Sequence, residues 1–416
     1  MGGFSYVEAE SSAKIKVIGV GGGGCNAVNN MIDSQLQGVQ FIVANTDSQA
    51  LALSRASVKI QLGETLTQGL GAGADPNVGR DAALESADVI REALAGSHMV
   101  FIAAGFGGGT GTGAAPVIAE ICKEIGALTV AVVTKPFAFE AKKRSKQAEE
   151  GLNRIKEMAD TVITIPNDRL RGLASKKSTL IDMFKRADEI LNHSVKGITD
   201  LILRPGLVNL DFADVKAIMS KAGLAIMGIG VSSGENRAIE AAERAISHPL
   251  LEDNSIVGAR GVLMNITCNS ELTMEETIEA SERIFNEIGD DDVEIIWGTS
   301  VDETLTDELR VTVIATGISD GKSHMPRSRS SFRDVSRSGD MARGFVRNPT
   351  PEEMKNFDEE MLQPTFIRKK QEARERKMFS TSSKVMPVNR FKGETAEKSE
   401  PYVDYDIPTF LRRKAD

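Results

Sequence analysis

The chain has 416 residues, of which 41% are hydrophobic, and this is enough for two domains that each have a core. Lysine and arginine total 50 against 59 acidic residues, and the net charge of −9 argues against non-specific binding to nucleic acid. The three cysteines are far apart and no histidine accompanies them, so we predict no metal site and a reducing compartment. Residues 1–12 lack the pattern of a secretory signal, and no run reaches the length of a membrane span. We therefore expect a cytoplasmic protein without a transmembrane segment.

After a flexible start at 1–12, strand-like and helix-like runs alternate over residues 13–177. The strand-like runs are 15–20, 41–45, 100–104, 129–134 and 161–165. Such alternation predicts an α/β fold, with a Rossmann-like domain whose parallel sheet has helices on both faces. Loops at the carboxyl ends of parallel strands meet at one edge, so we expect the ligand there.

A long central helix is predicted over residues 178–206, because apolar residues recur at three- and four-residue spacing before Pro205 and Gly206. The apolar positions are Ile181, Phe184, Leu191, Val195, Ile198 and Ile202. A second, smaller α/β domain is predicted over 207–318. Its expected strands are 225–231, 261–267, 293–299 and 309–316, with helices near 235–246 and 274–288.

The remaining residues predict a tail that forms no packed core. Residues 319–400 are rich in Ser, Arg, Pro, Glu and Lys, which is typical of a disordered linker. Residues 401–416 resemble a docking peptide for a partner protein, in which the candidate contacts are Asp406, Ile407, Pro408, Phe410 and Leu411. Residues 362–370 repeat residues 406–414 in type and order, and both contain Pro-Thr-Phe before basic residues. We hypothesise a second copy that makes the chain bivalent, with chance similarity in a basic linker as the alternative.

Two glycine-rich turns each follow a strand-like run and precede a helix-like run. Residues 21–24 are four glycines, and residues 107–113 read Gly-Gly-Gly-Thr-Gly-Thr-Gly. Without Cβ atoms the backbone N–H groups can close around a phosphate, and the helix behind adds a positive dipole end. Two such turns predict one nucleotide with a polyphosphate tail. The alternative is an NAD or FAD oxidoreductase, because Gly19, Gly21 and Gly24 fit G-x-G-x-x-G; the second turn counts against it.

The central helix carries a candidate site for the base. Asp188 interrupts the apolar face, and Phe184 lies one turn before it. A carboxylate can accept from the N1–H and the amine of guanine, whereas adenine offers an acceptor at N1, so this pair favours GTP. An Asp on the wet edge of a core helix is the alternative. Asn167 could contact the same base, and Glu140 and Arg144 could hold the ribose or form a solvated helix start.

Two acids follow the central helix at the start of the next one. Asp211 and Asp214 have the spacing of a helix cap, which is one interpretation. The helix rise places both acids about 20 Å or more from Asp188, so they could act only on a nucleotide bound by another subunit. They would then polarise the attacking water, with Asn209 orienting it. A contact between two different surfaces of one chain grows a filament.

These motifs resemble the tubulin/FtsZ family, and in particular its bacterial cell-division members. The resemblance covers about residues 14–318 and the final peptide. Beyond residues 107–113 it rests on Asn-Thr-Asp at 45–47, Gly-Leu-Gly-Ala-Gly-Ala at 69–74, Thr-Lys-Pro-Phe at 134–137, Ile-Pro-Asn-Asp at 165–168, Asn-Leu-Asp-Phe-Ala-Asp-Val at 209–215 and Asp-Ile-Pro-Thr-Phe-Leu at 406–411.

The resemblance implies a GTPase that binds GTP with Mg²⁺. The implied GTP contacts are Gly22, Gly23, Gly24, Cys25, Asn26, Ala72, Gly73, Gly109, Thr110, Gly111, Glu140, Arg144, Asn167, Phe184 and Asp188. It implies that Asp211 and Asp214 complete the site of the adjoining subunit, in head-to-tail protofilaments that form a ring at the division site beneath the membrane. The terminal peptide would bind membrane tethers and division regulators. A non-hydrolysing scaffold of the same fold is the nearer alternative. Cys25 and Asp75 depart from the family pattern, and Asp75 adds negative charge near the γ-phosphate.

Overall fold

The computed structural model describes residues 13–318, apart from 174–177, 205, 207, 209, 221–222, 252–255, 257 and 290–292. Asn209, the predicted linker, its internal repeat at 362–370 and the terminal peptide lie outside the described residues. The described part contains one ten-stranded sheet, in the order β3-β2-β1-β4-β5-β6-β7-β10-β8-β9.

The first six strands form the parallel half of the sheet. They are β1 (Ile15–Val20), β2 (Val39–Asn45), β3 (Val58–Gln61), β4 (Met99–Gly105), β5 (Leu128–Lys135) and β6 (Thr161–Pro166). Five of them lie within two residues of the runs predicted from sequence, and β3 was not predicted. Strands such as β4 and β5 are almost wholly buried, because helices cover both faces of a parallel sheet.

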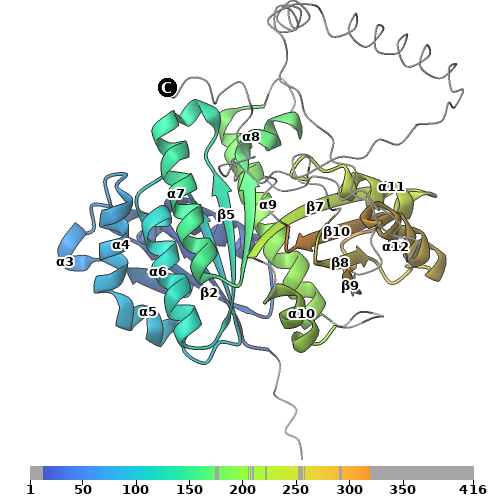
Figure 1. The fold of residues 1–416 in the computed structure, drawn as a ribbon, viewed down its shortest axis with the longest axis horizontal. Coiled ribbons are helices and arrows are strands. Elements are labelled where there is room, and N and C mark those ends of the chain that lie inside the picture. Colours follow the sequence, from blue (N-terminus) through green and yellow to red (C-terminus); the bar gives the residue numbers. More distant parts are fainter. Residues whose placement is uncertain are drawn as a thin grey trace, which may run out of the picture. The chain divides into compact units, whose positions relative to one another are not determined.

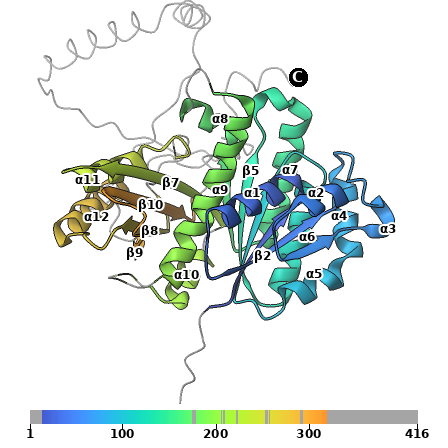
Figure 2. The same cartoon turned by 180° about the vertical axis from the view of Figure 1, so that it is seen from behind.

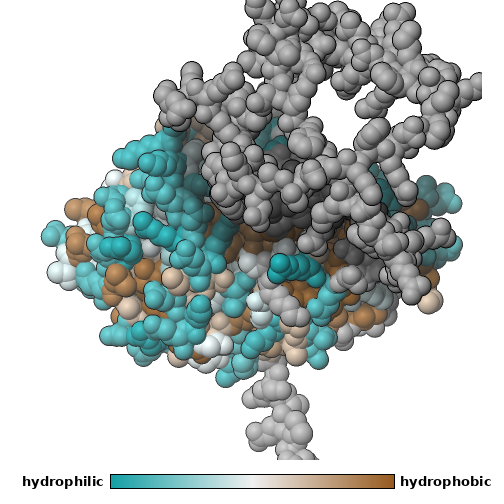
Figure 3. All heavy atoms as spheres, viewed as in Figure 1, coloured by the Kyte–Doolittle hydropathy of each residue, from teal (hydrophilic) through white to brown (hydrophobic). Residues whose placement is uncertain are grey.

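Helices cover both faces of this half (Figures 1 and 2). On one face α4 (Pro76–Glu85), α5 (Ala87–Leu94), α6 (Thr110–Glu124) and α7 (Lys142–Met158) share a core with the sheet. On the other face lie α1 (Gly21–Asp33), α2 (Ser48–Leu53) and the central helix α9 (Leu180–Leu203). The short elements are α3 (Glu64–Thr67), η1 (Ala138–Glu140), α8 (Asn167–Leu170) and η2 (Arg171–Leu173). Figure 3 shows hydrophilic side chains along the outer side of α7.

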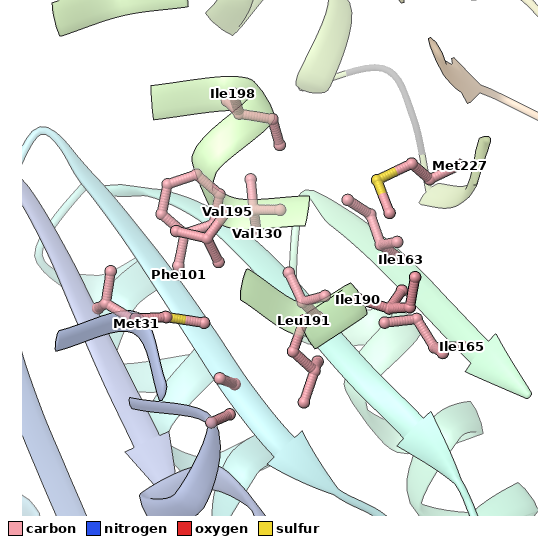
Figure 4. Packing of buried hydrophobic residues seen from close by; sticks show 14 of the residues in the cluster. Met31, Phe101, Val130, Ile163, Ile165, Ile190, Leu191, Val195, Ile198 and Met227 are labelled. Carbon is pink, nitrogen blue, oxygen red and sulfur yellow. The ribbon is translucent and has the colours of Figure 1, made fainter. Parts of the chain in front are cut away.

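The central helix α9 packs its middle and carboxyl-terminal turns on the sheet. Leu191, Val195 and Ile198 lie over Phe101 and Val130 in one hydrophobic cluster (Figure 4). The predicted apolar stripe does not remain buried at its start, where Ile181 is 68% exposed and Phe184 is 41% exposed. The buried positions of the first turns are instead Met183 and Ala187. The first turns therefore leave apolar side chains available for another contact.

The remaining strands continue the same sheet. They are β7 (Gly223–Ser233), β8 (Gly261–Cys268), β9 (Glu294–Val301) and β10 (Glu308–Thr316), with the helices α10 (Phe212–Met219), α11 (Arg237–Ile246) and α12 (Met274–Ile288). β7 joins β6 through three parallel pairs, from Thr161 with Gly223 to Ile163 with Ala225. β10 lies between β7 and β8 and is antiparallel to both. β8 pairs with β9 in parallel. The domain predicted over 207–318, the second unit, thus has its own strands but shares one sheet with the first domain.

Polar contacts also tie α9 to this second unit. Lys196 Nζ lies 2.9 Å from Asp302 Oδ2, and Asn265 Nδ2 donates to the carbonyl of Gly197 at 3.1 Å. Arg204, which follows α9, has its Nη1 3.8 Å from the same Asp302 carboxylate oxygen. Paired charges at a buried boundary are costly to separate, so these contacts hold α9 in one register against the second unit.

Candidate functional site

Two helices begin at the glycine-rich turns without a side-chain cap. α1 starts at Gly21 directly after β1, and α6 starts at Thr110 after Gly109. Neither helix has an acidic residue in its first turn, whereas Asp47, Asp75, Thr179, Asp211 and Thr273 cap α2, α4, α9, α10 and α12. The first N–H groups of α1 and α6 therefore stay available, and an anion is the ligand that both helix dipoles favour.

The two turns touch each other, and glycine makes the contact possible. Gly21 has a φ of +70°, and a Cβ at this residue would lie 2.8 Å from the nitrogen of Gly111. A Cβ on Gly111 would lie 2.5 Å from the carbonyl oxygen of Gly105. Of the two threonines of the second turn, Thr112 Oγ1 accepts from Gly107 N at 2.8 Å, so its hydroxyl holds the turn itself. Thr110 shares a 2.7 Å hydrogen bond with Thr46.

A cavity of about 430 Å³ opens over these turns at the carboxyl ends of β1, β4, β5 and β6. Most of the residues predicted to bind GTP line this cavity: Gly22, Gly23, Asn26, Gly109, Thr110, Gly111, Glu140, Arg144, Asn167, Phe184 and Asp188. Gly105, Phe106, Gly108, Thr134, Pro136, Ala187 and Leu191 complete the lining. The volume is in the range of small-molecule and cofactor sites.

Asn167 and Asp188 give one end of the cavity its hydrogen-bonding character. Asn167 is 5% exposed, and its Oδ1 has no hydrogen-bond partner among the described residues. Burial raises the pKa of Asp188 to about 7, and the charge of Glu189 adds to this shift. An unpaired buried oxygen is costly, so a ligand with N–H donors would stabilise this end.

Aromatic rings and an ion pair form the cavity wall beside that end. Phe184 meets the buried ring of Phe137 edge-on, with centroids 5.6 Å apart at 80°. Glu140 Oε1 accepts from Phe137 N at 2.9 Å, and its Oε2 lies 2.6 Å from Arg144 Nη1. Between the two, Ala141 has a φ of +90°, which is a strained conformation for a residue other than glycine. α7 begins at the next residue, Lys142, so Arg144 lies in the first turn of that helix.

The predicted γ-phosphate loop lies beside the second turn but does not line the cavity. A Cβ on Gly109 would lie 2.8 Å from the Cβ of Ala72 and 3.0 Å from the nitrogen of Asp75. Gly73 has a φ of +58° and open space around it. Asp75 caps α4, because its Oδ1 accepts from Asn77 N at 2.9 Å. The capping bond gives the Asp75 carboxylate a structural role.

Two predicted contacts of the first turn are buried beneath the cavity. A Cβ on Gly24 would lie 2.3 Å from the carbonyl oxygen of Ala103, so Gly24 serves close packing of α1 on β4. Cys25 is buried, Asn45 Nδ2 lies 3.9 Å from its Sγ, and burial raises the pKa of its thiol to about 11. Neither residue lines the cavity, so a contact between this pair and the nucleotide would come from the backbone.

The two candidate catalytic acids lie at the opposite edge of the sheet. Phe212 of α10 contacts His98, which directly precedes β4, with ring centroids 6.1 Å apart. The second glycine-rich turn follows the other end of β4, about 23 Å away for a seven-residue strand. Asp211 Oδ1 accepts from Asp214 N at 2.8 Å, so the capping interpretation describes Asp211 well. Both carboxylates are exposed and neither lines the cavity.

Comparisons with known proteins decide which family this architecture represents. Residues 14–175 match the GTPase domain of the Tubulin/FtsZ family, and residues 223–319 match the C-terminal domain of the FtsZ family. An empty FtsZ dimer from M. jannaschii is 47% identical, with a TM-score of 0.72 over 74% of this chain and 89% of that one. This chain belongs to the tubulin/FtsZ family. It is therefore a GTPase with a guanine-nucleotide site.

More distant members of the tubulin/FtsZ fold are similar over the same share of the chain. CetZ2 from Haloferax volcanii, as a GTPγS-bound protofilament, and CetZ1, as a GDP-bound monomer, are each 20% identical. Their TM-scores are 0.65 and 0.64, over 74% of this chain and 94% and 95% of theirs. The family assignment replaces the oxidoreductase alternative, because the glycines that fitted G-x-G-x-x-G serve a GTPase domain. No helix among the described residues is long and apolar enough to span a membrane.

The cavity fits a guanine nucleotide of this family. The free N–H groups of α1 and α6 suit the phosphates, and the unpaired Asn167 oxygen with the Asp188 carboxylate suits the N–H groups of guanine. The sequence reasoning did not assign Phe137, Thr134 or Leu191 to the site. Phe137 is part of the Thr-Lys-Pro-Phe motif at 134–137, but only the tertiary structure shows that its ring supports Phe184.

Proposed function

We propose that this GTPase polymerises head to tail and that each subunit completes the active site of its neighbour. The observation that carries the proposal is the separation of the two halves of the site. The nucleotide cavity lies at the carboxyl edge of the sheet, and the exposed Asp214 lies at the amino edge. One chain cannot bring them together, whereas a second chain stacked along the same axis can.

In the proposed mechanism the chain's own residues divide into binding and activating groups. The free N–H groups of α1 and α6 hold the phosphates, and Asp188, Asn167 and Phe184 hold the base. Mg²⁺ bound with GTP would offset phosphate charge, and the described residues contain no cluster of three metal-ligating side chains that would hold it alone. Asp214 of the neighbour polarises the attacking water, Asp211 holds the start of α10, and Asn209 orients the water.

The family resemblance supports a cellular role as well. We propose that the filaments form the ring at the division site, on the cytoplasmic side of the membrane. The terminal peptide at 401–416 would bind membrane tethers and division regulators, with residues 362–370 as a second copy. Without a membrane-spanning helix in the described part, attachment would depend on such a partner.

Electron microscopy with and without GTP, combined with a phosphate-release assay, tests the proposal. Wild-type protein should form filaments with GTP and release phosphate. Asp214→Ala should bind GTP and polymerise but release phosphate at a rate reduced by about two orders of magnitude or more. Normal turnover in Asp214→Ala would contradict the shared site, and filaments without phosphate release from the wild type would favour the non-hydrolysing scaffold.

A further inference from the structure

An apolar groove of about 460 Å³ lies on the second unit, separate from the nucleotide cavity. One face of α12 forms one side, through Met274, Ile278 and Phe285. Trp297 of β9 and Val208 form the other side. Met274 is 80% exposed and Ile278 is 46% exposed, so large apolar side chains here remain in contact with water. An exposed apolar patch of this kind marks an interaction surface.

The groove borders an open edge of the sheet. β9 is the last strand in the sheet order and pairs with β8 alone among the described strands. One short segment already adds to its outer side, because Thr299 N donates to the carbonyl of Val208 at 3.1 Å and Val208 N donates to Thr299 Oγ1 at 3.0 Å. An extended peptide could continue this addition toward Trp297 while its side chains enter the groove.

The chain itself leaves the described part close to this edge. Thr316 at the end of β10 pairs with Gly261 of β8, which in turn pairs with Glu294 at the start of β9. The exit therefore lies two strand spacings, about 10 Å, from the edge strand. Beyond Ile318 the sequence continues for 98 residues. A segment of this tail is the most readily available occupant of the groove.

Residues 362–370 have the composition that the groove requires. They read Leu-Gln-Pro-Thr-Phe-Ile-Arg-Lys-Lys, so apolar side chains are followed directly by three cations. Glu275, Glu279 and Glu282 follow one side of the apolar face of α12, and none of them has an ion pair within the described part. A coil from residue 318 to residue 362 spans about 36 Å, against about 52 Å to the terminal copy at 406. The shorter link raises the local concentration about threefold.

We propose that residues 362–370 dock in this groove on their own chain. Phe366 and Ile367 cover Met274, Ile278 and Trp297, and the cations at 368–370 face the acids of α12. The groove begins at Val208, three residues before Asp211. If the proposed function holds, docking covers the surface that meets the next subunit.

Trp297 is the only tryptophan of the chain and lines the groove, so its fluorescence tests docking in the full-length protein. With GDP present, Phe366→Ala should shift the emission to the red and raise acrylamide quenching about twofold. Phe410→Ala, the same change in the terminal copy, should leave both readings at the wild-type values. Lys369→Glu should act like Phe366→Ala, and adding Glu282→Lys should restore protection.

Three results would overturn the proposal. Equal quenching in wild type and Phe366→Ala would show that the segment does not cover Trp297. A change with Phe410→Ala instead would assign the groove to the terminal peptide. Protection that rises with protein concentration would assign it to a second copy of the chain. None of these readings depends on GTP hydrolysis, so the outcome is independent of the proposed trans mechanism.

Discussion

The ring of Phe137 stands edge-on to the ring of Phe184, with centroids 5.6 Å apart at 80°. Phe137 is fully buried, whereas Phe184 is 41% exposed at the wall of the nucleotide cavity. An edge-to-face contact fixes the plane of the exposed ring. The Phe184 ring is therefore held in an orientation in which it can stack on a base.

Replacing Phe184 with Ala should weaken GDP binding by about 1–3 kcal/mol, or roughly fivefold to 150-fold, because a base loses its stacking partner. The matched control is Phe139→Ala. Phe139 stacks on Phe137 with centroids 5.0 Å apart, but it does not line the cavity. Titration of each variant with a fluorescent GDP analogue measures the effect. An equal loss in both variants would show that the cluster acts only by holding the fold.

The binding of guanine nucleotides should depend on pH near neutrality through Asp188, whose pKa burial raises to about 7 in the free protein. The ionised carboxylate accepts from guanine, so affinity should fall about tenfold between pH 8 and pH 6 as the group takes up a proton. The stability of the free protein should change in the opposite sense. A raised pKa in the folded state means that stability increases as the pH falls below 7. Asp188→Asn should remove both dependences, and calorimetry at the two pH values would reveal them.

The sequence singled out the glycine-rich turns and Asp188, which line one cavity in the structure, because each signal is local. A strand, a run of glycines and a helix occupy adjacent residues, and one acid in an apolar helix face is visible without tertiary structure. It did not predict β3 or α2 to α5, of which β3, α2 and α3 have only four to six residues. α3 has four residues and lies between Gly63 and Gln68, which both have a left-handed conformation.

Features that depend on distant residues could not be predicted from local patterns. Among the described residues the two units share one sheet through three pairs between β6 and β7, which are about 60 residues apart in sequence. The exposure of Ile181 likewise depends on where α9 passes beyond the sheet, and the apolar spacing alone does not show this. The groove between α12 and β9 could not be predicted either, because no sequence motif indicates it.

Gly22→Ala should separate stability from nucleotide binding. Gly22 lies in the first turn of α1 at the cavity, and a Cβ there meets no atom within 4 Å. The folded protein should gain up to about 1 kcal/mol, because alanine loses less entropy in a helix. GTP affinity should fall about tenfold, since the methyl group occupies space at the phosphate cradle. Thermal melts test the gain in stability, and GTP titration tests the loss of affinity. Gly172→Ala, also in open space but away from the cavity, should leave affinity unchanged.

Mixing two inactive variants tests whether the active site is shared. Asp214→Ala keeps the nucleotide cavity but lacks the acid, and Asp188→Ala keeps the acid but lacks the carboxylate that would hold guanine. Each alone should release little phosphate. In an equal mixture, a heterologous contact places an intact Asp214 against an intact cavity in about a quarter of the interfaces, so about a quarter of wild-type turnover should return.

The control for this mixture pairs Asp214→Ala with the double variant Asp188→Ala/Asp214→Ala, in which no interface contains the acid. That mixture should stay inactive under the same conditions. If the first mixture releases no more phosphate than its two components measured separately, the acid does not act across the interface. If the control mixture regains turnover as well, a residue other than Asp214 activates the water, and the exposed position of Asp214 at the amino edge of the sheet serves α10 alone.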